Sequence, residues 1–108
     1  MTRWVATSLG TTPILPGTTI DVVFGEDNKL AGTAGCNRYS AACTIDGERV
    51  TVGPAVATRM YCGAPEGIME QEAAYFAALQ KAKVSRVVDG RLQLGPAAGV
   101  VTLVYEAE

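Results

Sequence analysis

The stretch IDGERVTV, at positions 45–52, decides how this chain is expected to fold. An Asp-Gly pair between β-forming segments predicts a tight β-hairpin with a type I′ turn, because both central residues of that turn have a positive φ. We therefore expect one strand to end at Ile45 and an antiparallel strand to run over Arg49–Val52.

The same pattern returns near the C-terminus. Asp89-Gly90 separates two β-forming segments, Val84–Val88 and Arg91–Leu94, and so predicts a second hairpin. A looser turn over Gly95–Gly99 leads to a last strand over Val100–Tyr105. Consecutive hairpins indicate an antiparallel meander rather than βαβ units.

Further strands are expected upstream of the first hairpin. Arg3–Leu9 is a β-forming segment, and a loop with two prolines follows it over Gly10–Gly17. Apolar residues alternate along Thr19–Phe24, which is typical of a half-buried strand. Turn residues at 25–28 then lead to a returning strand over Lys29–Thr33.

One segment, at about residues 65–83, predicts an α-helix. Pro65 suits a first helical position, and acidic residues follow it, as expected near the positive end of a helix. Apolar residues recur at helical spacing and predict a face that packs on the core; they are Met69, Ala73, Phe76 and Leu79. The fold class is therefore α+β: a curved, largely antiparallel sheet of about seven or eight short strands packed on a single helix.

Composition limits both the architecture and the function. The chain has 108 residues, the size of one domain, and we expect a single domain over residues 1–108. With 48% hydrophobic and 19% charged residues it can bury a core. A net charge of −2 without a basic stripe argues against nucleic-acid binding. No apolar run approaches the length of a membrane span.

The absence of histidine excludes several kinds of chemistry. With 0 His, this chain cannot itself form a Ser-His-Asp or Cys-His catalytic site, nor a His-ligated metal centre. It contains no CxxC pair, which removes the usual redox and zinc-ribbon patterns. The hydroxyls of Ser40 and Thr58 have no histidine base and no Ser-x-x-Lys spacing. We expect no catalytic residue, no cofactor and no metal.

Three segments carry a resemblance to a known family. Residues 32–40 read GTAGCNRYS, and residues 57–62 read ATRMYC. The expected helix then bears Met69, Glu72, Phe76 and Leu79. Together with Trp4 near the start and Leu92-Gln93-Leu94 near the end, this order of motifs resembles the META or HslJ-like domain family. The motif positions are Trp4, Gly35, Cys36, Asn37, Arg38, Tyr39, Thr58, Arg59, Met60, Cys62 and Glu72. The chain departs from the family pattern at Ala41-Ala42-Cys43.

The resemblance implies a strongly curved antiparallel sheet wrapped against one helix, which agrees with the reading of the residues. Members of the family are often exported proteins or lipoproteins of the bacterial cell envelope. Some are linked with heat-inducible expression and with novobiocin tolerance, and no enzymatic activity is established for the family. The segment from Met1 to Trp4 lacks the apolar stretch of a signal peptide, which does not argue against export, because a mature chain begins after its signal has been removed.

The cysteines leave structural and redox interpretations open. Cys36 and Cys62 match the two motif cysteines of the family, and we expect them to be bridged or at least in contact. A bridge would suit an oxidising envelope, a pair of buried thiols is the structural alternative, and a redox switch is the functional one. Cys43 is expected to be a small buried apolar residue.

Two polar groups have a binding and a structural interpretation. An exposed Asn37-Arg38-Tyr39 turn would recognise a ligand through the forked donors of the arginine. In the structural alternative, Asn37 caps local backbone and Arg38 pairs with a carboxylate such as Glu72. A buried Arg59–Glu72 pair would similarly hold a strand to the helix without any chemistry.

The sequence supports two functions of different kinds. The first is a monomeric, non-catalytic interaction module of the cell envelope, with an unidentified protein partner that binds near Arg38 and Tyr39 or in a groove along the sheet. The second is a domain that binds or sequesters an antibiotic-like small molecule. That function requires space that the apolar side chains between helix and sheet do not fill.

Overall fold

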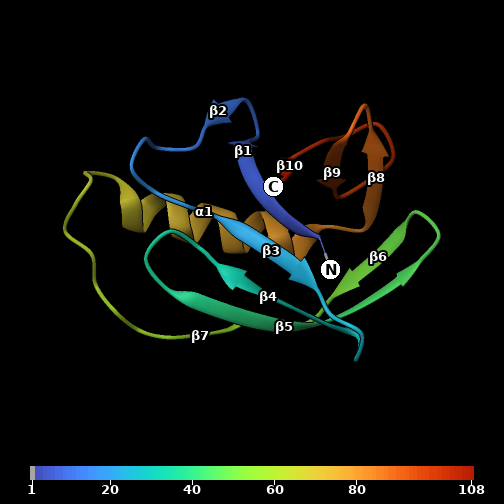
Figure 1. The fold of residues 1–108 in the computed structure, drawn as a ribbon, viewed down its shortest axis with the longest axis horizontal. Coiled ribbons are helices and arrows are strands. Elements are labelled where there is room, and N and C mark those ends of the chain that lie inside the picture. The colour runs from blue at the N-terminus through green and yellow to red at the C-terminus, as the bar shows by residue number, and fades with distance from the viewer. Residues whose placement is uncertain (1) are drawn as a thin grey trace.

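The computed structural model describes residues 2–108 and contains one helix and ten strands (Figure 1). In chain order these are β1 (Arg3–Leu9), β2 (Thr12–Pro13), β3 (Asp21–Phe24), β4 (Lys29–Thr33), β5 (Arg38–Asp46), β6 (Arg49–Val52), β7 (Val56–Ala57), α1 (Ile68–Lys81), β8 (Val84–Val88), β9 (Arg91–Gly95) and β10 (Leu103–Ala107). The α+β prediction is confirmed. The two strands beyond the expected number, β2 and β7, are two residues long each, too short to produce an alternating pattern.

All strands join one antiparallel sheet that closes on itself. Its order is β10-β9-β8-β6-β5-β4-β3-β1-β2, with β7 beside β5, and β1 also pairs with β10. The closing pairs run from Trp4↔Ala107 to Leu9↔Leu103, with an irregularity between Ala6 and Ser8. Helix α1 contacts β1, β6 and β9, which alternate with β10 and β8 around the closed sheet, so the sheet curves around the helix.

The two Asp-Gly hairpins form different turns. In the β8–β9 hairpin, Asp89 and Gly90 have φ values of 52° and 78°, as a type I′ turn requires. In the β5–β6 hairpin, Asp46 pairs with Arg49, so the loop residues are Gly47 and Glu48. Of these only Gly47 has a positive φ, 62°, which is typical of a type II′ turn. The expected type I′ turn is wrong here because the register places Asp46 in the strand.

Helix α1 is shorter than expected and presents a different face to the core. It begins at Ile68, so Pro65 lies before it rather than at its first position. Its buried residues are Ile68, Glu72, Tyr75 and Leu79. This face is displaced by one position from most of the expected apolar stripe, and Ala73 is exposed. Tyr75 lies on the buried face, where its hydroxyl bonds to those of Tyr39 and Tyr105, whereas Phe76 is only partly buried.

The last strand begins later than expected. Val100 donates its backbone N–H to the Ala97 carbonyl within the preceding turn, and β10 starts only at Leu103. Val100 and Val101 are exposed. The turn therefore occupies the first residues of the segment in which a strand was expected.

Three tyrosines, Tyr39, Tyr75 and Tyr105, link the helix to the sheet through their hydroxyls; we call them the tyrosine triad. The Tyr75 hydroxyl lies 2.5 Å from that of Tyr39 and 2.9 Å from that of Tyr105. Tyr39 in turn donates to the Asp21 carbonyl at 2.8 Å. Burial raises the pKa of all three hydroxyls above the ordinary value. Together with Leu79 and other apolar side chains, the triad fills the space between helix and sheet.

Candidate functional site

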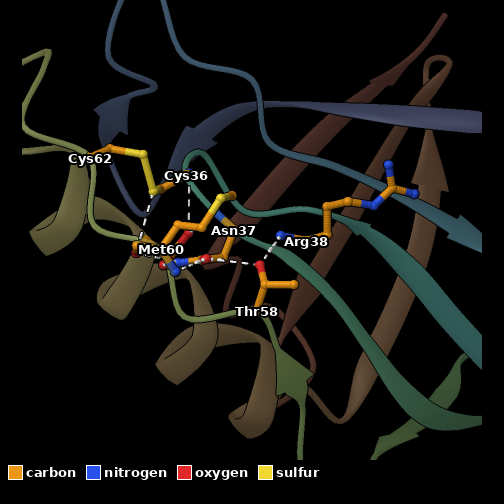
Figure 2. The surroundings of a disulfide bond; sticks show 7 residues. Cys36, Asn37, Arg38, Thr58, Met60 and Cys62 are labelled. Atoms are coloured by element: carbon orange, nitrogen blue, oxygen red, sulfur yellow. Dashed lines mark hydrogen bonds between the residues drawn. A yellow bond between two sulfur atoms is a disulfide. The ribbon is translucent and has the colours of Figure 1, made fainter.

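A disulfide joins the bend before β5 to the loop before α1. Cys36 and Cys62 are bonded, with 5.9 Å between their Cα atoms and a sequence separation of 26. Cys36 is buried, and Cys62 is partly exposed. The loop from β7 to α1 is therefore attached covalently to the sheet at one point (Figure 2).

Asn37 attaches the same loop through hydrogen bonds. Its Oδ1 accepts from the Met60 N–H at 2.7 Å and from the Thr58 hydroxyl at 2.8 Å. Its Nδ2 donates to the Met60 carbonyl at 3.1 Å. The side chain thus pairs with both backbone groups of Met60, as Figure 2 shows. The role of Asn37 is structural, but it differs from the local backbone cap that was expected, because the loop partners of its side chain lie 21 and 23 residues away in sequence.

Glu72 completes the network from the helix. One carboxylate oxygen accepts from the Asn37 N–H at 2.7 Å and the Cys36 N–H at 3.1 Å. The other accepts from Asn37 Nδ2 at 2.7 Å. The carboxylate is buried, and these charge-assisted hydrogen bonds offset its desolvation.

Neither expected arginine partner of Glu72 is present. Arg38 is exposed, and its side chain extends away from the disulfide in Figure 2. Arg59 is also exposed, and within residues 2–108 no ion pair involves Glu72. The expected pairs are wrong because two backbone N–H groups and one amide already satisfy the carboxylate, without the burial of a guanidinium group.

The loop held by this network displays large side chains to solvent. Met60 is 55% exposed, Tyr61 is 82% exposed, and Val56 on β7 is 72% exposed. Arg59 precedes Met60 in sequence and is exposed. Arg38 is also exposed, and its carbonyl accepts from the Thr58 N–H beside the β5–β7 pairing. We call these five residues, Arg38, Val56, Arg59, Met60 and Tyr61, the exposed strip. The strip combines apolar, aromatic and cationic side chains on a backbone that is fixed at Thr58, Met60 and Cys62.

Comparison with known proteins identifies the family. The sequence model of the META domain matches residues 1–108. The chain belongs to the META domain family. Two structures solved by NMR have the same fold. One is 25% identical with a TM-score of 0.73 and covers 97% of this chain and 87% of its own. The other, from Burkholderia xenovorans, is 23% identical with a TM-score of 0.71; the match covers 99% of this chain and 81% of the other. No curated protein matches the chain.

The remaining motif residues of this META domain, Trp4, Gly35 and Tyr39, contribute to packing and backbone geometry. Trp4 is partly buried against the core, and Tyr39 belongs to the buried triad rather than to an exposed binding turn. Gly35 has a φ of 104°, which side chains with a Cβ rarely adopt, and the Ile68 side chain would contact an added Cβ. Cys43 is buried, and burial raises the pKa of its thiol.

One feature of this META domain gave little signal in the sequence. An apolar groove of about 500 Å³ lies between α1 and residues 9–15. Segments far apart in sequence form it, so no local pattern predicts it. Its only sequence signal is the small size of Ala74 and Ala78 on one helix face.

Among residues 2–108 no cluster of three or more His, Cys, Asp or Glu side chains has an arrangement that could hold a metal ion. In the same range, no helix has both the length and the apolar character needed to cross a membrane.

Proposed function

We propose that this META domain is a non-catalytic protein-binding module of the bacterial cell envelope and that its partner binds the exposed strip. The observation that carries the proposal is that the side chains of this loop are exposed while its backbone is held in place. Met60 and Tyr61 are 55% and 82% exposed, yet Met60 is hydrogen-bonded to Asn37 through both its backbone groups. A fold that anchors an apolar loop outward, rather than folding it inward, favours a binding role for that loop.

The composition of the strip supports a protein partner. Tyr, Met and Arg are enriched at protein interfaces, and interface hot spots are rich in Tyr and Arg. Because the disulfide and Asn37 already order the loop, binding loses less conformational entropy than it would with a free loop. The two exposed arginines, Arg38 and Arg59, favour a partner surface that places carboxylates around an apolar pocket.

The disulfide supports the proposed compartment. Disulfides form and persist in oxidising environments such as the bacterial periplasm and are rare in the cytosol. The Cys36–Cys62 bond joins the loop that carries Met60 and Tyr61 to the bend before β5, so the same bond that fits an extracytoplasmic location also orders the binding loop. The non-catalytic part of the proposal is supported by the composition, since the chain has 0 His. It is also supported by the motif residues Asn37, Thr58 and Glu72, whose side chains are used in structural hydrogen bonds.

Site-specific photo-crosslinking in the cells that produce the protein tests the proposal. The photoreactive residue p-benzoylphenylalanine replaces Tyr61 in one variant and Val87 in the control, because Val87 is 61% exposed and lies outside the strip. We expect a discrete adduct from position 61 only. Excess purified domain should compete for it, and Tyr61→Ser domain should compete much less. Equal adducts at both positions, or equal competition by both domains, would contradict the proposal.

A further inference from the structure

The apolar groove beside α1 has a preformed wall. Gln71 accepts a hydrogen bond from the Leu15 N–H at 2.8 Å, and its Nε2 donates to the Thr18 hydroxyl at 3.1 Å. Gly10 donates its N–H to the Thr102 carbonyl at 2.7 Å, which holds the start of the same loop. The loop that forms one side of the groove is therefore attached to the helix and to the segment before β10.

The groove has room for a ligand because the residues on its helix side are small. Ala74 and Ala78 line it from α1, while Leu9 at the end of β1, Pro13 of β2 and Leu15 line it from the opposite side. The volume of about 500 Å³ lies within the usual range for small-molecule sites. Because the space between helix and sheet is already filled, a small ligand would bind in this surface groove rather than inside the sheet.

A single charge distinguishes this groove from an ordinary apolar hollow. Glu70 is the only charged residue among those that line it. Its carboxylate is exposed, and no ion pair within residues 2–108 uses it. The adjacent polar side chain, Gln71, is already hydrogen-bonded to the loop. The groove thus offers an apolar surface and one unpaired negative charge.

We infer that the groove binds amphiphilic organic cations: small molecules with an apolar body that packs on Ala74 and Ala78 and one ammonium group that pairs with Glu70. Apolar contact supplies most of the affinity. The carboxylate supplies the preference for a cation over a neutral or anionic head group. This site uses residues other than those of the exposed strip, and it stands whether or not the strip binds a protein.

Three naphthalene probes of the same body and different charge test the inference. They are 1-naphthylmethylamine, 1-naphthalenemethanol and 1-naphthoate, titrated into the ¹⁵N-labelled domain at neutral pH and low salt. We expect backbone shifts at residues 9–15 and 67–78, with the amine binding about three- to fivefold tighter than the alcohol, as an exposed ion pair allows. The anionic probe, 1-naphthoate, should bind more weakly than 1-naphthalenemethanol.

Matched variants separate the two parts of the site. Glu70→Gln should remove the preference for the amine and leave the affinity for the alcohol unchanged, whereas Glu26→Gln, at an exposed turn, should change neither. Ala74→Trp should weaken all three probes at least tenfold, because the indole fills the groove. Ala77→Trp is the control, an exposed position of the same helix that does not line the groove.

Three results would overturn the inference. The first is equal affinity for the three probes. The second is a set of shifts outside the groove. The third is a groove occupied by a second copy of the chain. In that case the diffusion coefficient of the wild-type domain would fall with protein concentration, and that of Ala74→Trp would not.

Discussion

The buried carboxylate of Glu72 should be the most sensitive polar group in the fold, and Glu72→Gln is the substitution that tests it. In the wild-type chain the side chain accepts three hydrogen bonds, from Cys36 N–H, Asn37 N–H and Asn37 Nδ2. A glutamine keeps the shape and one carbonyl oxygen, which can still accept from the two backbone groups. Its NH₂ group, however, faces the NH₂ group of Asn37, so one hydrogen bond is replaced by a contact between two donors.

The size of the effect follows from these contacts. A hydrogen bond to a charged group contributes about 1.5–3 kcal/mol, and a buried donor without an acceptor loses its solvation as well. We therefore expect Glu72→Gln to lower the free energy of unfolding by about 2–3 kcal/mol. Glu72→Ala, which leaves three donors without an acceptor, should lower it by about 3–5 kcal/mol.

Urea denaturation measures both effects. The midpoint should fall while the slope of the unfolding free energy against urea stays the same, because the surface exposed on unfolding is unchanged. The matched control is Glu70→Gln, two positions earlier on the helix and exposed, which should change stability by less than about 0.5 kcal/mol. If Glu72→Gln is no more destabilising than this control, the network described around Asn37 does not stabilise the fold.

Three further predictions concern other parts of the molecule. Replacement of Cys36 and Cys62 by serine should remove about 3.5 kcal/mol of unfolding free energy by the chain-entropy relation for a separation of 26 residues, as measured by urea denaturation. Gly32→Ala places a Cβ 2.1 Å from the Asp21 carbonyl oxygen and should cost about 3 kcal/mol in thermal unfolding, whereas Gly53→Ala, where the nearest atom is 3.5 Å away, should be far milder. Burial raises the pKa values of the tyrosine triad, so the folded state holds protons that the unfolded state releases above about pH 10. The triad's contribution to stability should therefore be constant below that pH and fall above it, and ultraviolet absorbance should show the triad ionising together with unfolding.

Local chemistry made most of the strands predictable. The segments around Asp46-Gly47 and Asp89-Gly90 carried both turn residues and β-forming flanks, and both hairpins are present. The pairing of β1 with β10 joins opposite ends of the chain, and no short-range pattern reports such a contact. The same holds for β7, whose two residues gain their strand character only by lying against β5.

The site was predictable in its residues and not in its partners. The motif positions Asn37, Cys62 and Glu72 do meet, but the sequence suggested arginines as the partners of Glu72. Charge pairing is easily proposed from a sequence, whereas a carboxylate that accepts from backbone N–H groups depends on loop geometry. The exposure of Tyr61 could not be predicted either, because a large aromatic side chain is more often expected to be buried than exposed.

Binding at the exposed strip, as proposed, requires that the strip is held in place rather than mobile. The ¹⁵N order parameters of Arg59, Met60 and Tyr61 in the oxidised protein test this requirement without any partner. We predict values above about 0.8, as for rigid backbone, and a clear decrease in the variant that lacks both disulfide cysteines. Values below about 0.6 in the oxidised protein, equal to those of the disulfide variant, would contradict the account.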